Sequence, residues 1–136
     1  MTQCPAYVEL VAATNYSFRR GASHPADMVL QAAALGLSAI GIADRNSVAG
    51  VVRAWVAVKK AKAENALPEG FRLVTGSRLV FADGTPDIVA YPKNRKGWGR
   101  LTRLLTVGNM RSNKGGCILR FDDLAGYLED LLLIIL

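Results

Sequence analysis

Histidine and cysteine are scarce in this sequence, and their scarcity excludes several kinds of active site. The 136 residues contain one histidine, His24, and two cysteines, Cys4 and Cys117. A catalytic metal site usually draws three or more ligands from His, Asp, Glu and Cys, and a Ser-His-Asp triad would have to use that same histidine. The two cysteines are too few and too far apart for a disulfide framework or a thiolate cluster, so we expect free thiols.

Long apolar runs, targeting segments and nucleotide-binding glycine motifs are also missing. The longest uninterrupted apolar run, 131–136, has six residues, against the roughly 18 that a membrane span needs. Residues 1–5 do not lead from a basic region into an apolar segment, so no secretory signal is visible. No glycine pattern matches a Walker loop or a dinucleotide-binding fingerprint. We therefore expect a cytoplasmic protein that contacts no membrane.

The sequence does have an excess of positive charge, concentrated in one segment. Lysine and arginine total 17 against 11 acidic residues, which gives a formal net charge of +6. Eight of the basic residues lie between Lys93 and Arg120, where no acidic residue occurs. This balance makes nucleic acid or another polyanion a plausible partner. Hydrophobic residues make up 51% of the chain, which is enough for one packed core.

Apolar periodicity predicts strands that alternate with helices. Strands are expected at 7–13, 38–43, 71–75, 79–81, 87–91 and 131–136, and helices at 25–35, at 48–65, from 94 or 97 onward, and at 122–128. Pro25 suits the first turn of its helix, with Ser23 or His24 as the cap, and Gly36 ends that helix. Strand, helix and strand in succession indicate βαβ units. The expected fold is therefore α/β, with a largely parallel sheet and flanking helices.

Charged residues follow the predicted strands, at the strand ends where α/β folds gather their chemistry. Asp44 is the one carboxylate convincingly at such an end. It can cap the next helix, hydrogen-bond the loop backbone, or ligate a metal. Arg19, Arg20, Arg45 and Arg78 could converge as an anion site, because guanidinium groups suit phosphate. They could equally be unrelated surface charges, and the residues alone leave both alternatives open.

The basic segment contains a second candidate site. Trp98 lies among several basic residues, namely Lys93, Arg95, Lys96, Arg100 and Arg103. Rings that stack on bases, beside cations that neutralise phosphates, are typical of surfaces that bind single-stranded nucleic acid. The alternative is a core tryptophan on an amphipathic helix whose basic face is solvated.

Seven stretches of the sequence carry a resemblance to a known family. They lie in order and without large gaps, at residues 7–10, 14–25, 32–37, 42–54, 76–79, 91–92 and 99–106. They resemble the start of the bacterial error-prone DNA polymerases, the ImuC branch of the C family. The N-terminal region of that family is a polymerase-and-histidinol-phosphatase (PHP) domain, a distorted β/α barrel longer than this chain. The resemblance implies that residues 1–136 are the N-terminal portion of one PHP domain, a partial barrel, with no second domain.

The same resemblance implies which positions would hold metal in a metal-competent PHP domain. They are Val11 and Ala13 for a His-x-His pair, Arg20 for an aspartate, Asp44 and Arg45 for an Asp-His pair, Arg78 for a glutamate and Asp87 for a histidine. Asp44 keeps its residue type, whereas three positions have become arginine, whose charge repels metal cations. The resemblance therefore implies a vestigial metal position at Asp44, no bound metal or other cofactor, and no catalytic residue in this chain.

A structural role within a larger enzyme is the function that the resemblance implies. The chain is expected to be the PHP segment of an error-prone translesion DNA polymerase, with the rest of the polymerase chain and DNA as partners. One alternative is a metal-dependent PHP phosphoesterase. Another is a stand-alone basic nucleic-acid-binding module centred on residues 93–120. Because a partial barrel exposes a sheet edge, we also expect self-association through that edge.

Overall fold

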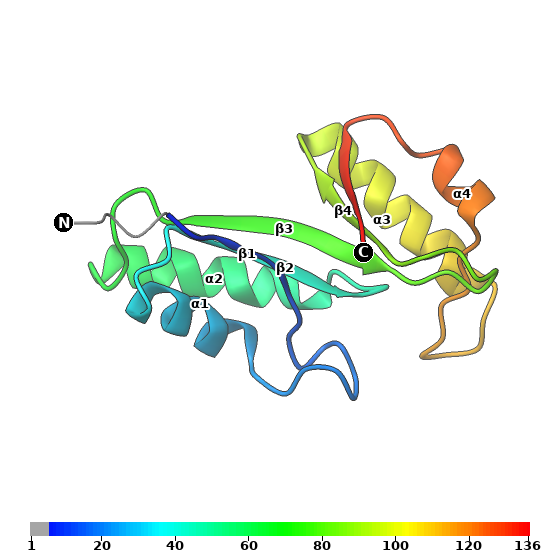
Figure 1. The fold of residues 1–136 in the computed structure, drawn as a ribbon. Helices are drawn as coiled ribbons and strands as arrows, with labels where there is room; N and C mark the ends of the chain where they lie inside the picture. The colour runs from blue at the N-terminus through cyan, green and yellow to red at the C-terminus, as the bar shows by residue number, and fades with distance from the viewer. Residues whose placement is uncertain (1–5) are drawn as a thin grey trace.

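Five strands form one mixed sheet within residues 6–136, the part of the chain that the computed structural model describes (Figure 1). In sheet order they are β1 (Glu9–Ala12), β2 (Ala39–Arg45), β3 (Arg72–Leu79), β4 (Ile88–Pro92) and β5 (Leu131–Ile135). β1, β2 and β3 pair in parallel, while β4 is antiparallel to both β3 and β5. Four of the five strands therefore run in one direction, and the prediction of a largely parallel α/β sheet is confirmed.

The helices begin and end close to where the sequence predicts. They are α1 (Pro25–Ala34), α2 (Ala49–Ala63), α3 (Arg95–Met110) and α4 (Phe121–Ala125). His24 occupies the N-cap position of α1, where its side chain makes no capping hydrogen bond, and Gly36 follows the helix at a φ of 77°. Asn94 caps α3, because its side-chain oxygen accepts a hydrogen bond of 3.0 Å from the Gly97 amide. None of the described helices is long and apolar enough to cross a membrane.

One strand differs from the prediction. The sequence predicts separate strands at 71–75 and 79–81, whereas β3 runs without a break from Arg72 to Leu79. β2 pairs with it as far as Arg78, and β4 pairs with its second half, so the ladder hydrogen bonds outweigh the weak strand propensity of Gly76. Phe81 lies beyond the strand and forms only an isolated bridge with Leu119.

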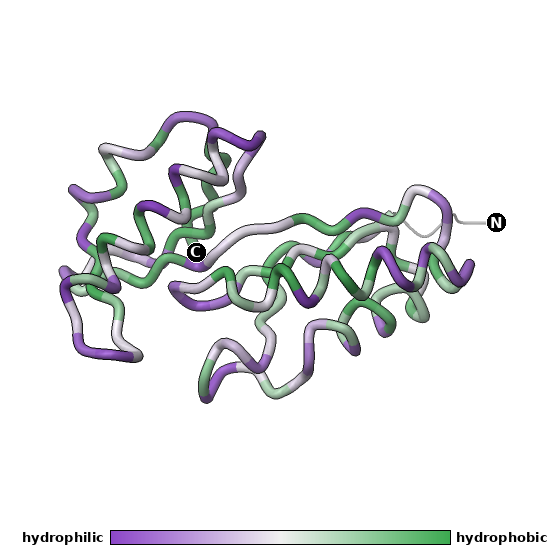
Figure 2. Tube along the Cα trace, turned by 180° about the vertical axis from the view of Figure 1, so that it is seen from behind, coloured by the Kyte–Doolittle hydropathy of each residue, from purple (hydrophilic) through white to green (hydrophobic). Residues whose placement is uncertain are grey.

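One face of the sheet packs against the helices. α1 and α2 cover β1 and β2 through a cluster that includes Val29, Ile42 and Val58. α3 covers β4 and β5 through a second cluster that includes Leu101 and Leu104. Hydrophobic positions accordingly run along the strands and the helices beside them in Figure 2. All the described helices therefore contribute side chains to the hydrophobic clusters on this one face of the sheet.

The opposite face of the sheet, which we call the concave face, is lined by a smaller apolar cluster. Its buried members are Ala43, Val89 and Tyr91, and the partly buried side chains packed on them are Val11, Val74 and Ile134. Strand alternation and register place these residues on the side away from the helices. Near the carboxyl ends of β2 and β3, Arg45 and Arg78 belong to this same face.

Tyr91 shows that the sheet curls around the concave face. Its hydroxyl, on β4, donates a hydrogen bond to the Leu10 carbonyl on β1. Two strands separate β1 from β4, so in a flat sheet they would lie about 14 Å apart, beyond the reach of a tyrosine side chain. Gly76 makes room for the ring, because a Cβ there would lie 2.7 Å from it. Burial, with a smaller effect from the charge of Glu9, raises the pKa of Tyr91 to about 12.

Candidate anion-binding site

Asp44 fastens the loop after β1 to the end of β2. Its Oδ1 accepts hydrogen bonds from the Thr14 amide at 2.7 Å and from the Ser17 hydroxyl at 2.6 Å, and its Oδ2 accepts one from the Thr14 hydroxyl at 2.8 Å. The aspartate is 1% exposed, and both partners are buried as well. Of the roles that the sequence leaves open for Asp44, the structure shows hydrogen bonding to this loop. The N-cap position of α2 is Val48, which has no side-chain capping hydrogen bond, and the Ser47 hydroxyl just before it accepts from the Ala49 amide at 3.1 Å.

The Asp44 carboxylate points to the helix side of the sheet. A Cβ on Gly50, in the first turn of α2, would lie 2.6 Å from Asp44 Oδ2. Strand alternation sends the neighbouring Arg45 to the concave face instead. Asp44, which the resemblance gives as a vestigial metal position, therefore does not face the same side of the sheet as Arg45 and Arg78.

Arg45 and Arg78 lie side by side at the ends of two parallel strands. They are register partners across β2 and β3, so both belong to the concave face. Just after β2, the backbone amide of Asn46 donates a hydrogen bond to the Arg78 carbonyl at 2.9 Å, which holds the ends of the two strands together. Arg78 Nε donates to Asp87 at 2.7 Å. Within the described residues, no carboxylate forms a salt bridge with Arg45.

These arginines line a small pocket of about 250 Å³, which we call the arginine pocket. Its walls are Val11, Ala13, Ser17, Arg20, Ala43, Arg45 and Arg78. Five of these seven residues occupy positions that the resemblance assigns to metal ligands. The structure thus brings together Arg20, Arg45 and Arg78, three of the four arginines for which the sequence leaves convergence open.

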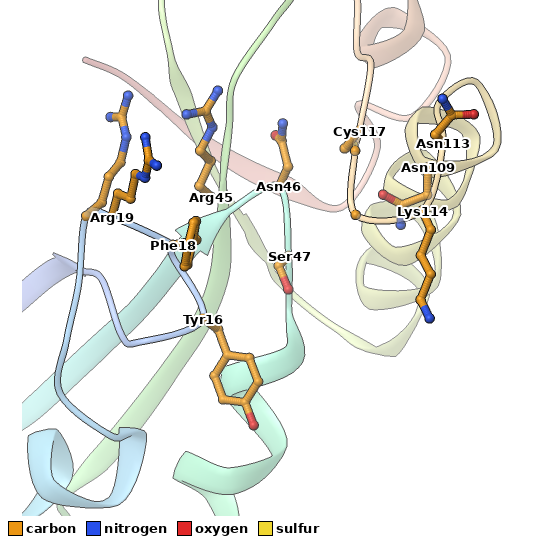
Figure 3. Close-up of a pocket in the computed structure, with 13 residues that line it drawn as sticks. Tyr16, Phe18, Arg19, Arg45, Asn46, Ser47, Asn109, Asn113, Lys114 and Cys117 are labelled. Atoms are coloured by element: carbon orange, nitrogen blue, oxygen red, sulfur yellow. The ribbon is translucent and has the colours of Figure 1, made fainter.

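Arg19, the fourth arginine, lines a larger neighbouring pocket of about 990 Å³, which we call the basic cleft (Figure 3). Arg20 and Arg45 belong to both pockets. The lining residues, with no carboxylate among them, are Tyr16, Phe18, Arg19, Arg20, Arg45, Asn46, Ser47, Asn109, Asn113, Lys114, Gly115, Gly116 and Cys117. Figure 3 shows Arg19, Arg45 and Asn46 extending in the same direction from one side of the cleft, with Asn109, Asn113 and Lys114 on the other.

Sequence reasoning missed the contribution of the second half of the chain to this cleft. Lys114 and Asn113 come from the polar, glycine-containing loop after α3, and they face a loop about 95 residues earlier. The available signal was the accumulation of Asn, Lys and Gly at 113–116, which predicts a loop without saying where it lies. Cys117 is a free thiol, and burial raises its pKa. Cys4 lies outside the described residues.

The residues predicted around Trp98 lie elsewhere and line neither pocket. Trp98 is partly buried and packs against the α1–α2 core, which favours the core interpretation. Arg100 forms salt bridges with Glu129 at 2.9 Å and Asp130 at 2.6 Å. The Asn94 side chain and then Arg100 lower the pKa of Asp130. Among the remaining members of this set, the following are exposed on or just before α3: Lys93, Arg95, Lys96 and Arg103.

The donor set of the arginine pocket does not fit a divalent metal. Its polar side chains are three arginines and Ser17, whose hydroxyl is already hydrogen-bonded to Asp44. Guanidinium groups have no lone pair for a metal and repel cations. No group of three or more His, Cys, Asp or Glu side chains in residues 6–136 is placed to hold an ion. Asp87, the other carboxylate at a predicted ligand position, is paired with Arg78.

A curled, largely parallel sheet with its helices on one face and a pocket at the strand ends defines a protein of the α/β class. The chain belongs to the PHP domain family, which matches residues 9–135. This confirms the family that the sequence resemblance implies.

Curated relatives carry the name error-prone DNA polymerase. The chain is 56% identical over 130 residues to error-prone DNA polymerase 1 of Rhizobium meliloti (strain 1021), which covers 96% of this chain and 11% of that protein. It is 54% identical over 131 residues to the error-prone DNA polymerase of Sinorhizobium medicae, with the same coverage of both chains. The corresponding enzyme of Caulobacter vibrioides is 52% identical over 125 residues, 92% of this chain and 11% of that protein. The chain therefore spans about a tenth of the length of these relatives.

A solved structure with a similar fold is an amidohydrolase from Chromobacterium violaceum with bound sulfate and no metal. The TM-score is 0.58 at 20% sequence identity, over 77% of this chain and 34% of that one. At this identity the likeness shows the fold alone.

Proposed function

We propose that this chain is the PHP segment of an error-prone DNA polymerase and supports that enzyme as a structural module without hydrolytic activity of its own. The observation that carries the proposal is the arginine pocket. Five of the positions that would hold metal ligands in a metal-competent PHP domain meet there as two apolar residues and three arginines. Such a site offers nothing to generate a metal-bound hydroxide, which is the nucleophile of metal-dependent phosphoester hydrolysis.

The proposal places residues 1–136 within a single PHP domain. The family match extends over almost all of the described chain, and the relatives continue far beyond the matched part. DNA synthesis, DNA as a partner and a cytoplasmic location are proposed for the complete polymerase. The exposed basic side chains of α3 and the basic cleft are compatible with a location near nucleic acid.

The test is metal uptake and phosphoester hydrolysis by the purified chain. After incubation with Zn²⁺, Mn²⁺ or Fe²⁺ and desalting, we expect elemental analysis to find well under one ion per chain. We expect no metal-dependent hydrolysis of p-nitrophenyl phosphate, because the pocket lacks ligands. A retained ion together with metal-dependent hydrolysis would instead establish the phosphoesterase alternative.

Self-association through a sheet edge stays a prediction. β5 is an edge strand of the described sheet, and its Leu132 and Ile135 side chains are 56% and 73% exposed. Unpaired strand edges beside apolar side chains favour pairing with another chain. We expect light scattering after size exclusion to show dimers or larger species whose share rises with concentration. A monodisperse monomer across the same range contradicts this expectation.

A further inference from the structure

The arginine pocket concentrates positive charge that the described residues only partly neutralise. Arg45 and Arg78 are register partners on adjacent strands, and like charges placed directly opposite each other destabilise a sheet. Arg20 adds a third guanidinium to the same pocket. Asp87 neutralises Arg78, but within residues 6–136 neither Arg20 nor Arg45 forms a salt bridge. An anion in the pocket would offset this repulsion.

The guanidinium groups also have donors to spare. Arg78 donates a hydrogen bond to Asp87 through Nε. Its two terminal nitrogens make no hydrogen bond to the described residues and remain available to a ligand. Val11, Ala13 and Ala43 form apolar walls beside the guanidinium groups of the exposed Arg20 and Arg45. A volume of about 250 Å³ is several times the roughly 30 Å³ of one water molecule. The pocket therefore has room for a tetrahedral oxyanion.

Ser17 holds two of the arginines in place. Its carbonyl accepts hydrogen bonds from the amides of Arg20 at 2.9 Å and Gly21 at 3.0 Å. Its hydroxyl accepts from the Arg45 amide at 3.0 Å and donates to Asp44. Arg19 adopts a φ of 64°, which turns the chain between Phe18 and Arg20. The backbones that carry Arg20 and Arg45 are thus tied to one buried residue, a form of preorganisation that favours ligand binding.

We propose that the arginine pocket binds a phosphate group, in the place where metal-competent relatives of this fold would hold metal. Three guanidinium groups from three segments match the planar, multidentate donor geometry that phosphate favours. The phosphate is either free or carried by a nucleotide, whose base and sugar would extend into the adjoining basic cleft toward Tyr16 and the 83% exposed Phe18. The proposal depends on the arginines alone and not on membership of a polymerase.

Isothermal titration calorimetry of the chain in chloride buffer of constant ionic strength tests the proposal. Inorganic phosphate is expected to bind at one site per chain, and both Arg45→Gln and Arg20→Gln are expected to weaken it at least tenfold. Arg45→Lys keeps the charge but loses the planar, multidentate guanidinium group, so its phosphate affinity should lie between those of Arg45→Gln and the unmodified chain. The matched control is Arg72→Gln, because Arg72 is exposed on the same strand and face as Arg78 but at the opposite end. Its affinity should equal that of the unmodified chain.

The results of this titration distinguish phosphate binding in the arginine pocket from non-specific attraction of phosphate by the positive charge of the chain. No saturable phosphate binding by the unmodified chain overturns the proposal, as does equal weakening by Arg72→Gln and Arg45→Gln. Circular dichroism establishes that each variant is folded; if Arg45→Gln is not, Arg20→Gln decides. A deoxynucleoside 5′-monophosphate that binds more tightly than phosphate identifies a nucleotide as the source, and equal affinity identifies the free ion. Metal uptake with hydrolysis would refute the proposed function, whereas loss of phosphate binding alone would refute only this inference.

Discussion

Replacing Asp44 with alanine is expected to lower the free energy of unfolding by about 3 kcal/mol or more. The substitution removes the acceptor for three hydrogen bonds and leaves the buried Thr14 and Ser17 groups without it. Each buried donor left unsatisfied costs about 1–3 kcal/mol. Because domains are stable by only about 5–15 kcal/mol, a loss of this size will be plain in urea denaturation followed by circular dichroism.

Two further variants separate this role from a metal-binding one. Asp44→Asn keeps the shape and one carbonyl oxygen, so we expect a smaller loss of about 1–2 kcal/mol. Asp122→Asn removes a carboxylate that is exposed on α4, and should change stability by less than about 0.5 kcal/mol. A metal ligand would give a different pattern. Without metal, Asp44→Asn and Asp44→Ala would be about as stable as the unmodified chain, and with metal they would lack the stabilisation that the unmodified chain gains. Equal stability of Asp44→Ala and the unmodified chain contradicts the structural role.

Replacing Gly97 with alanine is expected to destabilise the chain by about 2 kcal/mol, although alanine is the better helix former. A Cβ at Gly97 would lie 2.2 Å from the carbonyl oxygen of Asp130, a backbone atom just before β5. Overpacking of this kind typically costs 1–3 kcal/mol, and moving the backbone of Asp130 would also disturb its salt bridge with Arg100. A contact as short as 2.2 Å to a backbone atom places the cost near 3 kcal/mol, so a gain in helix propensity of at most about 1 kcal/mol leaves a net loss of about 2 kcal/mol.

Gly99 supplies the control on the same helix. A Cβ there meets no atom within 4 Å, so Gly99→Ala should stabilise the chain by about 0.5–1 kcal/mol through helix propensity alone. Thermal unfolding of both variants, under identical conditions, should therefore move the midpoint in opposite directions. Shifts of the same sign would show that α3 does not pack on the segment before β5 as described.

Local chemistry explains why most of the elements could be predicted. Pro25 and Gly36 bound α1, and Asn94 begins α3, because each acts on backbone within one turn of itself. The continuity of β3 through Gly76 could not be predicted in this way. It depends on pairing with β2 and β4, and on the need for a residue without a side chain beneath Tyr91.

For the candidate site, the sequence predicts which residues lie at the ends of strands, but not which of them form a pocket. Parallel strands place their carboxyl ends at one edge of the sheet, so the sequence puts Arg45 and Arg78 at that edge but leaves open whether they meet. Whether Arg20 joins them depends on the loop that Asp44 and Ser17 hold. For Trp98 and Arg100, composition alone suggests a nucleic-acid-binding surface that the structure does not form. Trp98 packs against the core, and Arg100 is engaged in salt bridges with Glu129 and Asp130.

The sequence by itself determined the fold class, the family resemblance and the replacement of metal-ligand residue types, because periodicity and residue identity are local properties. Only the tertiary structure decided where those side chains point. A one-residue step along β2 sends Asp44 to the helix side and Arg45 to the concave face, and the curl of the sheet brings Arg20, Arg45 and Arg78 around one pocket. Direction and convergence arise from pairing and packing between segments far apart in the chain.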